Sequence, residues 1–129
     1  MWPDDLLAAL RAQARGVYTA EAAVELLAGW NNGYWIRRAA ANLAALKVDY
    51  SDDPDEIGDT PMASIDWRAL NPNRITASSG ERAILVIACS LGGGRPVDLR
   101  DCLTSLGLHG IDCVTAAIVH AGGRRPDGV

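Results

Sequence analysis

Side chains of the types that bind zinc occur near the end of the chain. His109, Cys113 and His120 follow one another at spacings of 4 and 7 residues, so on a helix they would share one face. Cys102 would supply a fourth ligand and complete a set of two cysteines and two histidines. The spacing matches no standard zinc pattern, His109 is expected just outside the predicted helix, and free cysteine often packs as a small buried hydrophobe. We therefore keep zinc binding only as an alternative function and expect no cofactor.

No arrangement of residues in the sequence predicts an active site. Cys113 and His120 would lie about 10 Å apart along a helix axis, which is too far for direct proton transfer. The glycine-rich segment 92–95 lacks the Gly-Lys-Ser/Thr ending of a phosphate loop, and it follows a predicted helix instead of preceding one. We accordingly expect a protein that is not an enzyme.

The best candidate for a binding surface is a turn surrounded by aromatic residues and arginines. Residues 31–33 read Asn-Asn-Gly, which predicts a turn because both residue types tolerate positive φ. The residue types around it dominate binding hot spots: Trp30, Tyr34, Trp35, Arg37 and Arg38. The competing interpretation is that the Trp rings close the ends of an aliphatic core. This turn predicts a non-enzymatic accessory module that either interacts with another protein or associates with itself. We therefore expect a protein partner or a homo-oligomer.

Nucleic acid is the disfavoured alternative partner. Two predicted helices near the end of the chain are joined by the short segment 106–110, which has the length of a helix-turn-helix connection. A recognition helix needs cations and donors near its start, but residues 111–121 contain no Lys or Arg. A net charge of −4 also opposes general affinity for nucleic acid. A DNA-associated regulator would have to use the nearby arginines Arg95, Arg100, Arg124 and Arg125.

Residues 49–59 form a strongly acidic segment that predicts a solvated loop. Six of these eleven residues are acidic and none is basic. An EF-hand is excluded because Ile57 and Ser64 stand at positions that must provide calcium ligands. The remaining functional interpretation is that the loop presents negative charge to a basic partner.

Helix signals along the chain predict an all-α fold, a compact bundle of about six short helices around a central apolar helix at residues 82–91. Ser78 and Glu81 have the spacing of a capping box at the start of this central segment. The other helices are expected near residues 3–15, 19–30, 34–46, 60–70, 99–106 and 111–121. Residues 84–88 are also strand-like, so an α+β fold with a short strand there is the alternative.

Composition favours one soluble domain. The chain has 129 residues and no Phe, so its core must be aliphatic, which suits packed helices. We expect a single helical domain over residues 1–123 and a flexible tail at 124–129. The longest apolar run, residues 83–89, is too short to cross a membrane. An odd set of cysteines indicates free thiols and a cytoplasmic protein: Cys89, Cys102 and Cys113.

Several short segments carry a resemblance to a group of proteins. They are AAVELL at 22–27, WIRR at 35–38, MASIDW at 62–67, SGE at 79–81 and PVDLRD at 96–101. Together they resemble a group of small uncharacterised actinobacterial proteins over about residues 20–122. The resemblance implies a bacterial cytoplasmic setting and an accessory role of the kind encoded on mobile DNA. It carries over no catalytic or binding residue.

Overall fold

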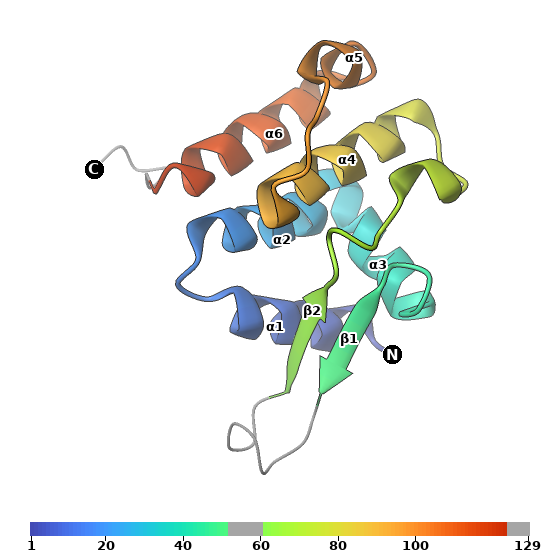
Figure 1. Ribbon diagram of the computed structural model, residues 1–129, viewed down its shortest axis with the longest axis vertical. Coiled ribbons are helices and arrows are strands. Elements are labelled where there is room, and N and C mark those ends of the chain that lie inside the picture. Colours follow the sequence, from blue (N-terminus) through green and yellow to red (C-terminus); the bar gives the residue numbers. More distant parts are fainter. Residues whose placement is uncertain (52–60, 124–129) are drawn as a thin grey trace.

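Six α-helices and a two-stranded sheet form the part of the chain that the structure describes (Figure 1). The structure is a computed structural model, and it describes residues 1–51 and 61–123. The strands β1 (Val48–Ser51) and β2 (Met62–Ile65) pair antiparallel, with Val48 opposite Ile65. The predicted mainly helical fold is confirmed. The helices are α1 (Pro3–Ala14), α2 (Tyr18–Gly29), α3 (Tyr34–Ala41), α4 (Ser79–Gly93), α5 (Leu99–Thr104) and α6 (Leu108–Ala121), with two short 3₁₀ helices, η1 (Trp30–Asn32) and η2 (Pro72–Arg74).

Local hydrogen bonds set where α4 and α5 begin. The Ser78 hydroxyl accepts a hydrogen bond from the Glu81 backbone N–H at 3.2 Å, and the Glu81 carboxylate accepts one from the Ser78 N–H at 2.9 Å. Asp98 caps α5 by accepting a hydrogen bond from the Asp101 N–H at 3.1 Å. These side chains satisfy backbone groups that the start of a helix leaves unpaired. The predicted capping box is therefore confirmed.

The centre of the molecule is shared by α2 and α4. Helix α2 packs against α4 and α6, and it also contacts α1, so it lies between α1 and α6 (Figure 1). Ile84 and Leu85 of α4 are fully buried, as are Leu6 of α1 and Ala22 of α2. The resulting core is mainly aliphatic, as the absence of Phe predicts, but it also contains the buried Trp35 ring. Of the described helices, none is both long and apolar enough to cross a membrane.

The small sheet corrects two predictions. Residues 62–65 were expected in a helix, but they form β2, in which Ala63 and Ile65 are buried and Ser64 is exposed. This alternation follows from the strand period of two, with one face turned to α1. Residues 49–51 were expected in a loop and belong to β1. The rest of the acidic segment lies outside the described residues, as does the predicted tail at 124–129.

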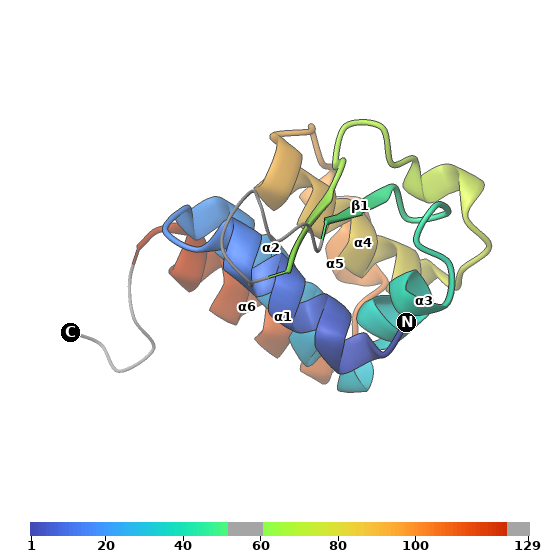
Figure 2. The same ribbon diagram turned by 90° about the horizontal axis from the view of Figure 1, so that it is seen from below.

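Helix boundaries supply the other corrections. Residues 84–88 lie inside α4, so the alternative strand there is wrong. Helix α3 ends at Ala41 and not near residue 46, because the Asn42 side chain accepts a hydrogen bond from the Ala45 N–H and starts a turn toward β1. Helix α6 begins at Leu108, so His109 lies within it and not before it. The chain start and α3 lie side by side in both ribbon views (Figures 1 and 2).

Candidate protein-binding groove

Trp35 of the predicted aromatic turn lies in the core. Only 1% of this residue is exposed, and its indole nitrogen donates a hydrogen bond to the Glu81 carbonyl oxygen at 2.9 Å. The Tyr34 ring meets the Trp35 ring edge to face, with 5.1 Å between the ring centroids. Trp35 therefore joins α3 to the start of α4, and its ring is not available to a partner in this conformation.

Trp30, Tyr34 and Arg38 form a half-buried layer beside Trp35. The Trp30 and Tyr34 rings also meet edge to face, at a centroid distance of 5.9 Å. The Arg38 guanidinium lies over the Trp35 ring at 5.3 Å and donates hydrogen bonds to the Tyr34 hydroxyl and the Thr76 carbonyl. Because these groups contact one another, much of the predicted patch stabilises the fold.

Arg37 is the exposed member of the predicted patch. Its guanidinium donates hydrogen bonds to the carbonyl oxygens of Asn32 at 3.2 Å and Asn31 at 3.1 Å. Both asparagines have positive φ values, 50° for Asn31 and 56° for Asn32, which Asn tolerates better than most residues. Arg37 therefore holds the α2–α3 turn and keeps its charge at the surface.

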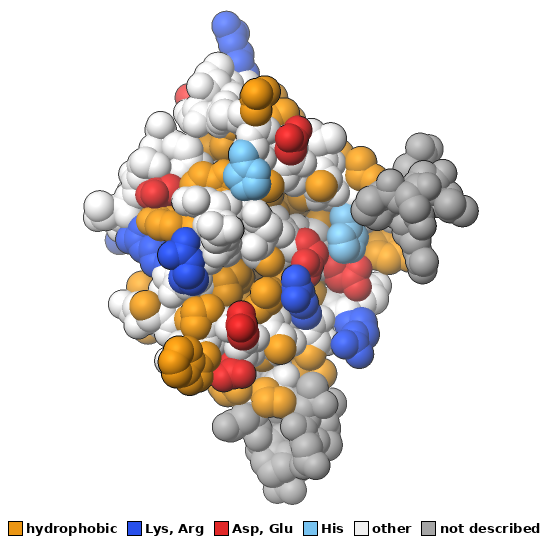
Figure 3. Space-filling view, turned by 180° about the vertical axis from the view of Figure 1, so that it is seen from behind, with side chains coloured by type: hydrophobic (Ala, Val, Ile, Leu, Met, Phe, Trp, Pro, Cys, Tyr) orange, Lys and Arg blue, Asp and Glu red, His pale blue; other side chains and the backbone are white. Residues whose placement is uncertain are grey.

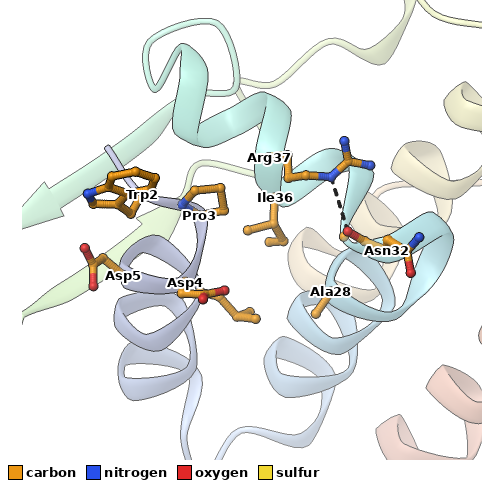
Figure 4. A pocket seen from close by; sticks show the side chains of 10 residues that line it. Trp2, Pro3, Asp4, Asp5, Ala28, Asn32, Ile36 and Arg37 are labelled. Atoms are coloured by element: carbon orange, nitrogen blue, oxygen red, sulfur yellow. Dashed lines mark hydrogen bonds between the residues drawn. The ribbon is translucent and has the colours of Figure 1, made fainter.

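A groove of about 560 Å³ lies between this turn and the start of α1, and we call it the α1–α3 groove (Figure 4). The side chains of Ala28 and Ile36 lie between its two sides (Figure 4), and Leu7 adds to the apolar lining. Charged and aromatic side chains border it, with Trp2 and Asp5 on the α1 side and Arg37 on the α3 side (Figure 4). The remaining lining residues are Pro3, Asp4, Asn32 and Gly33.

Trp2 is the most conspicuous side chain of the groove. It is 77% exposed, whereas Trp35 is buried and Trp30 and Trp67 are half-buried. An exposed indole beside a concave, partly apolar surface is typical of a binding hot spot. The sequence patterns did not identify Trp2, because it lies far along the chain from the aromatic residues around residues 30–35. The signal that could have identified it is a large aromatic residue directly before Pro3, at the N-cap of α1, where its side chain makes no capping hydrogen bond.

Negative and positive side chains lie on opposite walls of the groove. The carboxylates of Asp4 and Asp5 have no hydrogen-bond or ion-pair partner among the described residues. Both belong to the first turn of α1, where the helix dipole stabilises negative charge. Arg37 stands on the opposite wall (Figure 4). The groove can therefore pair with a cation at the α1 side and disfavours one at the α3 side.

Of the four predicted zinc ligands, His109 and Cys113 lie side by side, but His120 and Cys102 do not join them. The His109 Nε2 accepts a hydrogen bond from the Asn31 N–H at 3.2 Å, with the Cys113 sulfur 3.8 Å away. His120 pairs instead with Glu21 at 2.9 Å, and Cys102 is buried in α5. The two histidine side chains lie well apart on the face shown in Figure 3. In residues 1–51 and 61–123, no group of three or more His, Cys, Asp or Glu side chains could hold a metal ion.

The side chains of Glu21 in α2 and His120 in α6 form a hydrogen-bonded pair at 2.9 Å. The His120 hydrogen bond, followed by that from the Gly16 N–H, lowers the pKa of Glu21 from its usual value of 4.5. The Tyr18 ring meets His120 edge to face at a centroid distance of 6.5 Å. No hydroxyl or thiol is bonded to His120 in the described structure, so this pair lacks a nucleophile.

Helices α5 and α6, within the described residues, offer few cations to DNA. Helix α6 packs against α2 and α4 and contains no Lys or Arg. The Arg95 guanidinium donates hydrogen bonds to the carbonyls of Trp67 and Leu70, so it fastens a loop to α4. Arg124 and Arg125 lie outside the described residues. The geometry of α5 and α6 thus adds no support for DNA recognition.

The chain matches no protein-family model, no curated protein and no solved structure. Its described part is a small, mainly helical fold with an open, partly apolar groove at its surface. The residues of this groove are therefore the observation that bears on function.

Proposed function

We propose that this chain is a non-enzymatic protein-interaction module and that its α1–α3 groove binds a basic, partly apolar segment of a partner protein. The exposed Trp2 ring beside the two unpaired carboxylates of Asp4 and Asp5 is the observation that carries this proposal. Trp residues dominate binding hot spots. Burying an exposed Trp ring yields a large hydrophobic free energy, and the Trp2 ring becomes buried only when a partner covers it.

Charge determines which partner fits. A Lys or Arg side chain can stack on the Trp2 indole while its charge approaches Asp4 or Asp5, combining a cation–π contact with ionic attraction. Arg37 repels a cation at the other end of the groove, so it fixes the direction in which the segment lies. The net charge of −4 further favours encounter with a basic partner.

Apolar residues of the partner would fill the middle of the groove. Leu7, Ala28 and Ile36 provide carbon surface between the charged walls. Short aliphatic side chains on either side of the basic residue would lose their contact with water there. The preferred ligand is therefore a segment that combines a cation with aliphatic neighbours.

The setting that we propose is the bacterial cytoplasm. Cys89, Cys102 and Cys113 are free thiols, and a reducing compartment keeps thiols in this state. The resemblance to small actinobacterial proteins supports the same setting.

Short capped peptides that combine Leu with Lys or Arg test the proposal, with matched peptides in which Glu replaces each cation. We expect calorimetry to detect binding of the basic peptides and a loss of at least about tenfold in affinity for Trp2→Ala. The matched control is Tyr18→Ala, which removes an aromatic residue that is 55% exposed and does not line the groove. Equal binding by wild type and Trp2→Ala would contradict the proposal.

Self-association is the second candidate, because leucines around the α5–α6 corner are also exposed. The exposed fractions are 46% for Leu99, 41% for Leu103 and 86% for Leu108. Exposed leucines that lie close together often mark a surface that a second protein molecule covers. Sedimentation equilibrium of wild type and Leu108→Lys tests this, and a monomer at every concentration for both would exclude it.

A further inference from the structure

A second cavity, of about 590 Å³, lies between the segment that follows α3 and the loop that precedes α4. Its lining includes three cationic residues, Arg38, Lys47 and Arg74, and no acidic residue. We call it the basic pocket. It shares no lining residue with the α1–α3 groove. Such a concentration of positive charge is unexpected in a chain whose net charge is −4.

The cations of the basic pocket are largely unpaired. Among the described residues, neither the Lys47 ammonium nor the Arg74 guanidinium has a hydrogen-bond or ion-pair partner. Arg38 uses only its Nη1 atom, on Tyr34 and Thr76, and leaves Nε and Nη2 for another acceptor. These donors therefore remain available to an anion.

Two nearby arginines, Arg82 and Arg95, differ from the cations of the basic pocket because their guanidinium groups are already hydrogen-bonded to the backbone. The Arg82 guanidinium donates to the carbonyl oxygens of Ile75 at 3.0 Å and Ala77 at 3.1 Å, and also to that of Pro72. Arg95 likewise donates to backbone carbonyls of the preceding loop. The loop is thus already held by Arg82 and Arg95, and Lys47 and Arg74 are not needed for that purpose.

The fold holds the basic pocket in shape. Lys47 has a φ of 55°, in the left-handed region that few non-glycine residues adopt, and its carbonyl accepts a hydrogen bond from the Asp66 N–H at 3.0 Å. Arg74 follows a turn in which the Asn71 side chain accepts a hydrogen bond from the Asn73 N–H at 3.0 Å. The bond from Arg38 to Thr76 joins the two walls. Two segments of the chain, residues 38–47 and 69–76, thus present their cations to one cavity.

We propose that the basic pocket binds a small molecule that carries a phosphate or pyrophosphate group. Guanidinium groups pair with phosphate oxygens through two parallel hydrogen bonds, and Lys adds a point charge. The volume is within the range of small-molecule pockets, and Ala45, Ala69 and Ile75 offer carbon surface to the rest of the ligand. A nucleic acid needs an extended row of cations, so a compact cluster of three cations favours a small ligand.

Inorganic pyrophosphate is the probe that tests this proposal on the full chain, at constant ionic strength. We expect saturable binding by calorimetry and amide shift changes in ¹⁵N spectra confined to residues around 45–47 and 69–76. Lys47→Gln and Arg74→Gln should each weaken binding at least about tenfold, because each removes one unpaired cation. Both side chains are exposed, so unchanged thermal unfolding without ligand will show that the variants fold.

Arg68→Gln is the matched control, since Arg68 is an exposed arginine of the same loop that does not line the pocket. It should bind pyrophosphate as wild type does. Absence of saturable binding, or an equal loss for Arg68→Gln, would overturn the proposal. Tighter binding of duplex DNA or RNA than of pyrophosphate, lost in Lys47→Gln and Arg74→Gln, would also overturn it and assign the surface to nucleic acid.

Discussion

The Trp35 indole N–H and the Glu81 carbonyl oxygen are 2.9 Å apart and join α3 to the first turn of α4. The same Glu81 caps α4 through its side chain, so one residue receives the indole and fixes the helix start. This contact explains why Trp35 is buried although it belongs to a segment with the composition of a binding site.

Trp35→Ala should destabilise the protein by about 3–5 kcal/mol, because it leaves a large cavity and an unpaired carbonyl. Trp35→Phe should cost less, since it retains most of the buried ring and loses the hydrogen bond. Urea unfolding followed by circular dichroism measures both. A change below about 1 kcal/mol for Trp35→Ala would mean that the ring is not part of the core.

Gly92→Ala tests the packing of Trp67 on α4. A Cβ atom at Gly92 would lie 2.5 Å from the Trp67 ring, so the ring would have to move. We expect a loss of about 1–3 kcal/mol in the free energy of unfolding. Gly29→Ala is the control, because no atom lies within 4 Å of its added Cβ and Ala favours a helix. Equal stability of the two variants would contradict this packing.

The Glu21–His120 pair predicts a dependence of stability on pH. Because the folded protein lowers the pKa of Glu21, its carboxylate stabilises the fold above the usual pKa of 4.5. This contribution is lost as the pH falls through the lower, folded-state pKa. The melting temperature should therefore fall less steeply in Glu21→Gln than in wild type as the pH decreases below about 5. Parallel melting curves over this pH range would show that the pair contributes nothing.

Cys89 should be the least reactive thiol of the native protein. Burial raises its pKa to about 11, with a smaller opposing effect of Arg95, so little thiolate exists at pH 8. Cys113 is only half-buried. Iodoacetamide labelling read by mass spectrometry should modify Cys113 first and Cys89 only after unfolding. Rapid labelling of Cys89 in the folded protein would contradict its burial.

Features set by neighbouring residues were predictable from the sequence. The Ser78–Glu81 capping box and the Asp98 cap involve residues within one helical turn, so their spacing alone identifies them. The sheet was not predictable in the same way, since β1 and β2 stabilise each other across the segment between them and each has only four residues. A strand of this length has too few residues to show a clear periodicity.

The candidate sites were predicted only in part. Arg37 was identified from its surroundings, and it does line the α1–α3 groove, but the other wall comes from Trp2, Asp4 and Asp5 at the start of the chain. The sequence did not predict the basic pocket because Arg74 is distant in sequence from Arg38 and Lys47, and the three meet only through the turns after α3 and β2. Residue types indicated binding, but only the fold determines which of them share a surface.

The measurement that tests the proposed function most directly is the ratio of affinities for the matched Lys and Glu peptides. We compare wild type with the Asp4→Asn/Asp5→Asn variant, in which both side chains keep their size and lose their charge. Wild type should prefer the Lys peptide by at least about tenfold, and the variant should lose most of this preference, since the carboxylates provide the selectivity. The same preference in both proteins, or none in wild type, would contradict the account of the groove.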